Sequence, residues 1–269
     1  MGPLGVAGNI SRDLAVYPGG TRIEMLGGAA LHVGLAAARA GLPAAPVSVI
    51  GRDLGWIAGD PRLAGLDLHH VQVVPGRSCA FRLTYDETGN LASTRASFGV
   101  AAALTPHVIS MIGSHSAYHV CCRRPLDAPI VLGRLAAVGI PFSLDFHLAS
   151  ASMIIPAAST FLPQASAVFV NAAEYAILAQ VTDPGTLTTL VISDGPRPAV
   201  VLRRGQEAAS AVPPAAAVAE VTGAGDTLTG TFLAASARGL SCQAALDEAV
   251  NAASVAVASA GLTIPAPGG

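Results

Sequence analysis

Short apolar runs alternate with helix-like segments along this sequence, and that alternation limits the folds open to it. Segments 47–50 and 167–170 are mostly apolar and only a few residues long, as strands buried on both faces usually are. Alanine-rich helical patterns, such as 127–138 and 243–260, lie between or after such runs. Strands and helices that alternate in this way form a parallel sheet covered by helices on both faces. The sequence therefore predicts an α/β fold.

The apolar residues are mostly small and aliphatic. Hydrophobic residues make up 52% of the sequence, whereas aromatic residues make up only 4%. Ala, Val and Leu in this proportion suit a buried sheet under tightly packed helices. The longest apolar stretches, 28–38 and 251–260, fall short of the roughly 18 residues that a membrane span needs. No basic segment followed by an apolar run opens the sequence, so we expect a cytoplasmic protein without a membrane partner.

All 15 basic residues are arginine, and the sequence contains no lysine. A P-loop needs a lysine on the β- and γ-phosphates, protein kinases need one on a strand, and pyridoxal phosphate enzymes need one for the Schiff base. These three classes are excluded, and any phosphate chemistry must depend on backbone N–H groups, arginine and metal. The formal net charge of −2 favours no nucleic-acid partner.

The cysteines and histidines show no metal-ligand spacing. Because no C-x-x-C pair occurs and free cysteines are commonly buried, we expect buried, reduced thiols. If residues 121 and 122 lie on a strand, their side chains point to opposite faces. The thiols in question are Cys79, Cys121, Cys122 and Cys242.

Residues 77–98 have a different pattern from the rest of the chain. Apolar and polar side chains alternate on either side of the polar segment 86–90, which predicts a β-hairpin with a polar tip. Because the hairpin interrupts an α/β chain, we expect it to be a flap or lid rather than part of the main sheet.

The segment Gly223-Ala224-Gly225-Asp226 precedes a predicted helix and has the residues that phosphoryl transfer needs. Small residues leave the N–H groups at a helix N-terminus open to an anion. A carboxylate in the first turn is favoured by the helix dipole and can accept a proton from a nearby hydroxyl. The alternative is that Asp226 only caps the helix and the glycines only form a turn.

Segment 221–226 resembles the DTTGAGD motif of the ribokinase-like (PfkB) family of small-molecule kinases. Other blocks resemble that family in the same order along nearly the whole chain: 6–13, 27–41, 50–55, 171–174, 191–195 and 251–253. The resemblance implies a ribokinase-like three-layer α/β sandwich with a mostly parallel central sheet. It also implies one kinase domain, residues 1–269, whose small β lid is formed by about 12–26 and 77–98.

The resemblance also implies roles around the transferred phosphoryl group. Asp226 would take the proton from the substrate hydroxyl, and the backbone N–H groups of Gly223, Ala224 and Gly225 would form an anion hole. ATP and Mg²⁺ are the implied cofactors, with Glu174 acting on the metal through water. The implied cofactor-binding residues are Thr222, Asn171, Glu174, Gly195 and Asn251.

The same resemblance implies a substrate pocket and a partner. The substrate would be a sugar, a nucleoside or a similar metabolite, and the lid would form a homodimer contact. The implied substrate-binding residues are Asp13, Gly27, Gly28, His32 and Arg123.

Two departures from the family pattern affect the substrate pocket. His32 stands where the family often has Asn, so it either contacts a sugar hydroxyl or only packs on its helix. Arg123 stands where ribokinases often have Glu. Either Arg123 or Arg124 binds an acidic or phosphorylated substrate, or both are solvated at a strand end, and we favour the solvated interpretation.

Two further departures affect the cofactors. Glu220 replaces an Asp that helps to hold potassium in some relatives, which leaves potassium dependence open. Two prolines within 193–198 predict a shortened loop on the nucleotide side.

The leading hypothesis is therefore an ATP-dependent kinase that phosphorylates a hydroxyl group. The alternative is a weakly catalytic or non-catalytic binding protein on the same fold. A dinucleotide-binding oxidoreductase is excluded because no G-x-G-x-x-G motif follows the first strand.

Overall fold

The computed structural model describes residues 2–87, 91–215, 223–258 and 261–264. Within these residues the larger sheet has nine strands, in the order β13-β12-β11-β10-β9-β8-β1-β4-β5. Neighbouring strands from β5 to β11 are parallel, whereas β12 is antiparallel to β11, and β13 to β12. The strands are Leu4–Ala7 (β1), Ala44–Gly51 (β4), Val71–Val74 (β5), Tyr118–Cys122 (β8), Phe142–Phe146 (β9), Val168–Asn171 (β10), Leu190–Asp194 (β11), Arg197–Arg203 (β12) and Gln206–Ala211 (β13).

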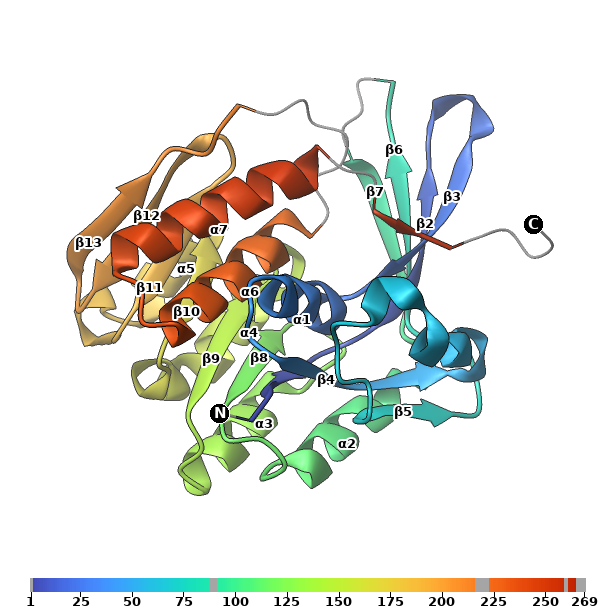
Figure 1. Cartoon of the computed structure of the whole chain (residues 1–269), viewed down its shortest axis with the longest axis horizontal. Helices are drawn as coiled ribbons and strands as arrows, with labels where there is room; N and C mark the ends of the chain where they lie inside the picture. Colours follow the sequence, from blue (N-terminus) through green and yellow to red (C-terminus); the bar gives the residue numbers. More distant parts are fainter. Residues whose placement is uncertain (1, 88–90, 216–222, 259–260, 265–269) are drawn as a thin grey trace.

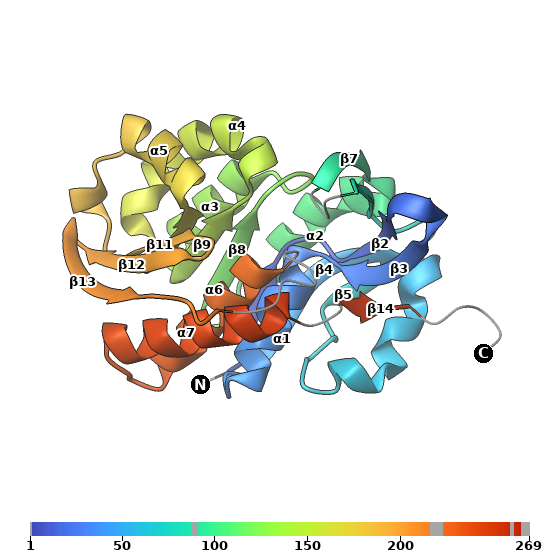
Figure 2. The same ribbon diagram turned by 90° about the horizontal axis from the view of Figure 1, so that it is seen from above.

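Helices cover both faces of this sheet, which confirms the predicted α/β sandwich (Figures 1 and 2). One face carries Ala29–Arg39 (α1), Ala224–Ala237 (α6) and Cys242–Val257 (α7). The other carries Leu104–Met111 (α2), Ala128–Ala137 (α3), Leu148–Ala158 (α4) and Ala172–Val181 (α5). Sequence analysis assigned no helix to 104–111 or 148–158, each of which contains a proline. Among the described helices, none is long and apolar enough to cross a membrane.

The cysteine predictions are confirmed. All four cysteines are free, and only Cys242 is not fully buried. Cys121 packs in the apolar cluster under α1, whereas Cys122 packs in the cluster under α2 to α5, so their side chains point to opposite faces of the sheet.

A second sheet of five described strands lies at one side of the helical layers, in the order β14-β3-β2-β6-β7 (Figure 1). The predicted hairpin at 77–98 forms two of its strands, which pair antiparallel. Residues 12–26 contribute most of a second hairpin, whose first strand pairs with β6. The strands are Ser11–Val16 (β2), Arg22–Gly27 (β3), Ala80–Tyr85 (β6), Leu91–Ser97 (β7) and Leu262–Thr263 (β14).

Helices α1 and α6 pack backbone against backbone. A Cβ atom on Gly230 would lie 2.3 Å from the carbonyl oxygen of Val33 and 2.8 Å from the Cβ of Ala36. Only a residue without a side chain allows this approach, which fixes the position of α6 over the sheet.

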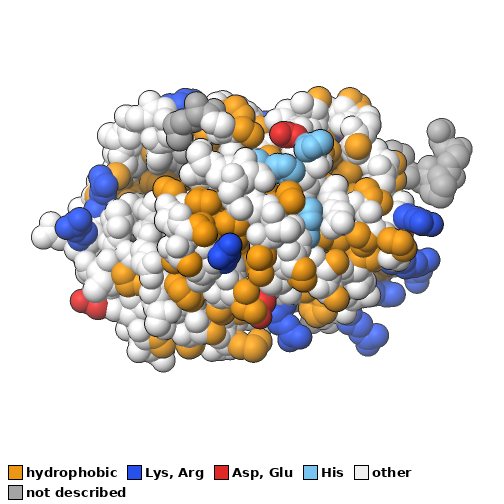
Figure 3. All heavy atoms as spheres, turned by 90° about the horizontal axis from the view of Figure 1, so that it is seen from below, with side chains coloured by type: hydrophobic (Ala, Val, Ile, Leu, Met, Phe, Trp, Pro, Cys, Tyr) orange, Lys and Arg blue, Asp and Glu red, His pale blue; other side chains and the backbone are white. Residues whose placement is uncertain are grey.

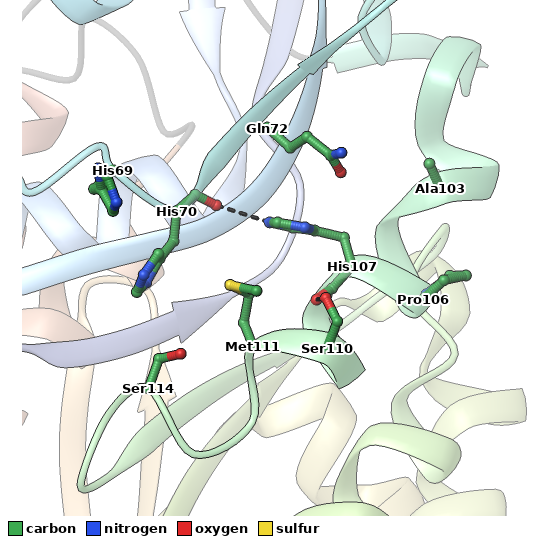
Figure 4. A pocket seen from close by; sticks show the side chains of 9 residues that line it. All are labelled: His69, His70, Gln72, Ala103, Pro106, His107, Ser110, Met111 and Ser114. Atoms are coloured by element: carbon green, nitrogen blue, oxygen red, sulfur yellow. Dashed lines mark hydrogen bonds between the residues drawn. The ribbon is translucent and has the colours of Figure 1, made fainter.

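Four of the seven histidines gather at the amino-terminal edge of the central sheet, although sequence analysis saw them as scattered. Figure 3 shows histidine side chains on the face that it presents, and Figure 4 shows those that line a cavity of about 850 Å³. Inside this edge, Nδ1 of His70 lies 2.9 Å from Nε2 of His115, and Nδ1 of His115 donates to the carbonyl oxygen of Pro3. His69 and His107 lie beside this pair, and Nε2 of His107 lies 2.9 Å from the carbonyl oxygen of His70.

The His115 ring is held neutral by its surroundings. Burial and the neighbouring His70 lower the pKa of His115 below its ordinary value. Because the Nδ1 proton of His115 is directed at Pro3, its Nε2 accepts a hydrogen bond from Nδ1 of His70.

Replacing Gly230 with alanine should destabilise the fold. Alanine favours a helix interior by about 1 kcal/mol over glycine, but here its Cβ would overlap the Val33 carbonyl. We expect a net loss of about 1–3 kcal/mol in the free energy of unfolding, measured by urea denaturation. Gly59→Ala is the matched control, because a Cβ there meets no atom within 4 Å. Equal stability of the two variants would contradict this account of the helix contact.

Stability should fall at mildly acidic pH because of His115. Its folded pKa is lowered, so the unfolded chain binds more protons below about pH 6.5 and stability is lost as the pH falls through that value. His115→Asn keeps a donor for Pro3 but cannot titrate. We expect the urea midpoint to fall less steeply in this variant than in the wild type between about pH 7 and pH 5. Parallel pH profiles would show that His115 is not responsible.

Candidate active site

The central sheet has one point at which the strand order reverses. From β1 the chain goes to β4 and β5 on one side, and later to β8, β9 and β10 on the other. Ligands of open α/β sheets bind at the carboxyl ends of the strands beside such a point. Asn9 follows β1 and Arg123 follows β8 at this edge, and the pairing of β1 with β8 brings the two strand ends together.

The N-terminus of α6 supplies the predicted anion-binding turn. Gly223 is the N-cap residue with φ of 81°, and its would-be Cβ would lie 3.3 Å from the ring of His32. The carbonyl oxygen of Gly223 accepts from the N–H of Thr227, so the N–H groups of the residues between them precede the first helical bond. Space around the exposed Gly225 is open to at least 4 Å from a would-be Cβ. The backbone here can therefore approach a phosphate closely.

The N-cap residue of α6 is Gly223, so Asp226 does not cap the helix as the alternative interpretation held. It lies in the first turn of α6, and its side chain is mostly buried. Its Oδ1 accepts a hydrogen bond of 2.9 Å from Nη2 of Arg123.

Arg123 links two carboxylates across the site. The same Nη2 also donates to Oδ2 of Asp145 at the end of β9. The side chain of Arg123 is 16% exposed, so the prediction that it is solvated is wrong. Arg124 is exposed, and its guanidinium lies over the ring of Phe98.

The charges of this ion-pair network support one another. Burial disfavours the charged form of Arg123, but the attraction of Asp145 and Asp226 outweighs it and raises the pKa of Arg123. Burial likewise opposes ionisation of Asp145, but the attraction of Arg123 and the contact with His119 lower its pKa. Arg123 and Asp145 are therefore both charged at neutral pH.

One set of buried side chains has ligand atoms close enough for a metal ion. The candidate ligand atoms of His119, Cys121 and Asp145 all lie within 4.8 Å of one another. However, burial raises the pKa of the Cys121 thiol, and the guanidinium of Arg123 already neutralises Asp145. A second cation at this position would be repelled, so these residues do not fit a metal site.

The N-x-x-E block forms a capping box at the start of α5. Oδ1 of Asn171 accepts from the N–H of Glu174, and Oε2 of Glu174 accepts from the N–H of Asn171, both at 2.9 Å. Burial raises the pKa of Glu174, although the bonds from Asn171 oppose this. The spacing therefore has a structural role that sequence analysis did not consider. It also fixes a buried carboxylate at the carboxyl end of β10, two strands from Arg123.

The predicted substrate-binding glycines let a buried carboxylate lie against the backbone. A Cβ on Gly27 would lie 2.2 Å from Oδ2 of Asp13, whose Oδ1 accepts from the N–H of Phe81. Gly28 has φ of 102°, and a Cβ there would lie 2.3 Å from the carbonyl oxygen of Asn9. The two hairpins of the second sheet thus meet the start of α1 at Asp13.

The remaining predicted site residues lie in several different elements. Half-buried His32 lies on α1 and packs against Gly223, so this predicted substrate-binding residue lies beside the predicted anion-binding turn. Gly195 lies in the exposed two-residue turn between β11 and β12, and Asn251 is exposed on α7. Thr222 and Glu220 lie outside the described residues.

Sequence analysis missed Asp145 and Asn9 as site residues. Asp145 is 5% exposed and Asn9 is 4% exposed, and each lies at or just after the carboxyl end of a central strand. A buried polar residue at such a strand end was the available signal. Asp145 is bonded to Arg123, which lies 22 positions away in the sequence, and no local pattern indicates such a contact.

Solved structures with this fold include a Burkholderia thailandensis nucleoside kinase in complex with inosine, with a TM-score of 0.80 and 19% identity, covering 96% of this chain and 92% of that one. A putative ribokinase II from E. coli in complex with ATP and Mg²⁺ has a TM-score of 0.82 and 17% identity, covering 97% and 94%. These similarities establish the ribokinase-like fold.

A sequence relative and a family model concern the family of the chain as well as its fold. A cytidine kinase from Thermococcus kodakarensis is 36% identical over 90 residues, so the match covers about a third of each chain, 33% of this one and 32% of the relative. The model of the pfkB family carbohydrate kinases matches residues 19–268, which include the anion turn, Asp226 and the ion-pair network described above. The chain therefore belongs to the pfkB family of carbohydrate kinases.

Proposed function

We propose that this chain is an ATP-dependent kinase that phosphorylates a hydroxyl group of a sugar, a nucleoside or a similar metabolite. The observation that carries the proposal is the position of Asp226. Its carboxylate lies in the first turn of α6, beside N–H groups that precede the first helical bond, at the point where the strand order reverses. Phosphoryl transfer to an alcohol needs a base and an anion site side by side.

Asp226 acts as the base in this proposal. Arg123 binds its Oδ1, so Oδ2 is the oxygen that would take the proton of the acceptor hydroxyl. The N–H groups of Ala224 and Gly225 would bind the oxygens of the transferred phosphoryl group as its charge redistributes. Since the sequence has no lysine, these backbone donors would share this work with arginine and metal.

The residues present fit ATP and Mg²⁺. Open space around Gly225 and the first turn of α6 suit a phosphate chain. Glu174 offers a carboxylate held by its capping box, and a hydrated magnesium ion prefers such oxygen ligands. When bound, magnesium would neutralise charge on the phosphate oxygens. Gly195 and Asn251 are proposed to lie along the nucleotide.

The substrate side is proposed to be the pocket around Asp13. Asp13 is 6% exposed and accepts a backbone hydrogen bond, so its carboxylate is held ready to accept substrate hydroxyls. The relatives named above include a cytidine kinase and a nucleoside kinase bound to inosine, which supports a nucleoside or another hydroxylated sugar. His32 and the glycines beside it would complete this wall.

The second sheet is proposed to act as a lid over this pocket. Residues 12–26 and 77–98 both belong to it, and Asp13 on β2 ties it to the substrate side. All the described side chains of its edge strand β7, from Ala92 to Ser97, are exposed. Exposed sheet edges are natural sites for strand pairing, which supports a homodimer through the lid.

One observation favours the alternative of a weakly catalytic or non-catalytic binding protein. Arg123 binds the proposed base, and a positive charge there makes a carboxylate less basic. ATP consumption with a panel of sugars, nucleosides and sugar acids separates the two functions, since a binding protein consumes no ATP with any of them.

Asp226→Asn should abolish turnover. The amide keeps the shape of the side chain but cannot accept the hydroxyl proton, so we expect kcat to fall at least about 100-fold. Nucleotide affinity, measured by calorimetry, should change little because the N–H groups of the turn remain.

Asp247→Asn provides the matched control, because it makes the same change on the exposed surface of α7. Full activity of Asp226→Asn would remove this residue from the mechanism. A large loss of nucleotide affinity would mean instead that Asp226 is needed to build the nucleotide site.

Light scattering should give a mass in solution about twice that of one chain, because the exposed edge of β7 favours pairing between copies. A single-chain mass at micromolar concentration would contradict the dimer.

A further inference from the structure

We infer that Arg123 and Asp145 are positioning residues for Asp226, and that the three charged side chains form one electrostatically coupled network. In this arrangement Arg123 holds one oxygen of the base, and Asp145 holds Arg123 in place from the sheet. The catalytic meaning of the inference rests on the proposed kinase function, whereas the charge coupling itself does not.

The network is built into the rigid part of the fold. Cys121 and Asp145 are paired across β8 and β9, and His119 and Ser143 are paired two residues earlier. Nδ1 of His119 lies 2.9 Å from Oγ of Ser143, and its Nε2 lies 3.5 Å from Oδ1 of Asp145. A buried row of side chains therefore leads from the sheet interior through Asp145 and Arg123 to Asp226.

One buried donor of this row has no partner in the described part of the chain. Nε of Arg123 is buried without a hydrogen-bond partner among the described residues, whereas Nε2 of His119 and Oδ1 of Asp145 face each other at 3.5 Å. Arg123 instead uses a single nitrogen to bridge two carboxylates, which places its charge between them.

The position of Arg123 argues against a clamp for an acidic substrate. Its Nη2 already binds Asp145 and Asp226, so a substrate carboxylate or phosphate would have to compete with two buried anions. The charge of Arg123 is better placed to oppose the effect of nucleotide phosphates on the carboxylate of Asp226. The phosphates of a bound nucleotide would favour protonation of a nearby carboxylate, and a guanidinium at 2.9 Å opposes this.

Other titratable groups interact with this network. Cys121 on β8 interacts electrostatically with Asp226, and Glu174 on α5 does so with Arg123 and Asp145. His32 on α1, in contrast, packs against Gly223. His147 follows β9, and its pKa is lowered by burial and by Arg123, although Asp226 and Asp145 oppose this. Among them, Arg123 is the cation bonded directly to Asp226, and Asp145 is the anion bonded to that cation. Removing either one should therefore move the titration of Asp226, and in opposite directions.

The first test follows the carboxyl carbon of Asp226 by ¹³C NMR in the ligand-free chain labelled at aspartate. The resonance is assigned by its loss in Asp226→Asn. Arg123→Gln removes the bonded cation, so we expect the titration midpoint of Asp226 to rise by about one pH unit or more. Asp145→Asn removes the neighbouring anion, so we expect a lower midpoint.

Two further variants separate charge from structure. Arg123→Gln combined with Asp145→Asn removes one charge of each sign, so its midpoint should return toward the wild-type value. Arg124→Gln removes the adjacent exposed charge and should leave the midpoint unchanged, because its guanidinium lies over Phe98 in contact with solvent. If the single Asp145 variant does not fold, Arg123→Lys replaces it. That variant keeps the charge without the planar fork, and should keep the midpoint while lowering kcat.

The second test is the pH dependence of kcat/KM with a substrate found in the panel. The acidic limb of this profile should move to higher pH in Arg123→Gln and to lower pH in Asp145→Asn. Shifts in the same direction, or no shift in either titration, would overturn the inference. So would a rise in KM confined to anionic substrates, which would make Arg123 a substrate clamp. A chain that phosphorylates nothing contradicts the kinase proposal alone, because the NMR titration needs no turnover.

Discussion

The close contact between α1 and α6 is the constraint on which the site depends. Because Gly230 has no side chain, the two helices touch at the backbone of Val33, and α6 is held at a fixed height over the sheet. That height brings Gly223 against His32 and carries Asp226 to the ends of β8 and β9. A shift of α6 would therefore disturb both the contact of Gly223 with His32 and the ion pair of Asp226 with Arg123.

The absence of lysine gives the ion-pair network its importance. An ammonium group on a flexible chain could follow a phosphate as it moves, whereas the charge of Arg123 is anchored by Asp145. In the proposed mechanism, phosphate binding would then depend largely on backbone N–H groups, which cost no side-chain entropy to place. Buried charges in this arrangement are held only because each has an opposite partner.

Local patterns predicted the elements better than the contacts between them. The strands predicted at 47–50 and 167–170 and the hairpin at 77–98 follow from residues close together in sequence, and the structure has them, whereas the strand at 71–74 was not predicted. Helices α2 and α4 were missed because proline obscured their pattern. Arg123 was misjudged because its partner Asp226 lies 103 positions away, and no local pattern reports such a contact. The capping box of Asn171 and Glu174 was overlooked because the same spacing also fits the family motif.

The two edges of the central sheet differ in charge, and this decides where an anionic ligand belongs. Helices α1, α5 and α6 begin at the carboxyl edge, so their N-termini direct N–H groups and partial positive charge there. The amino edge has the histidine-lined cavity, but α2 ends beside it at Met111 and presents carbonyl groups. His115 is also held neutral at that edge, so it offers no charge to a phosphate. The electrostatics of the two edges therefore favour the carboxyl edge, beside Asp226, for the phosphate chemistry proposed above.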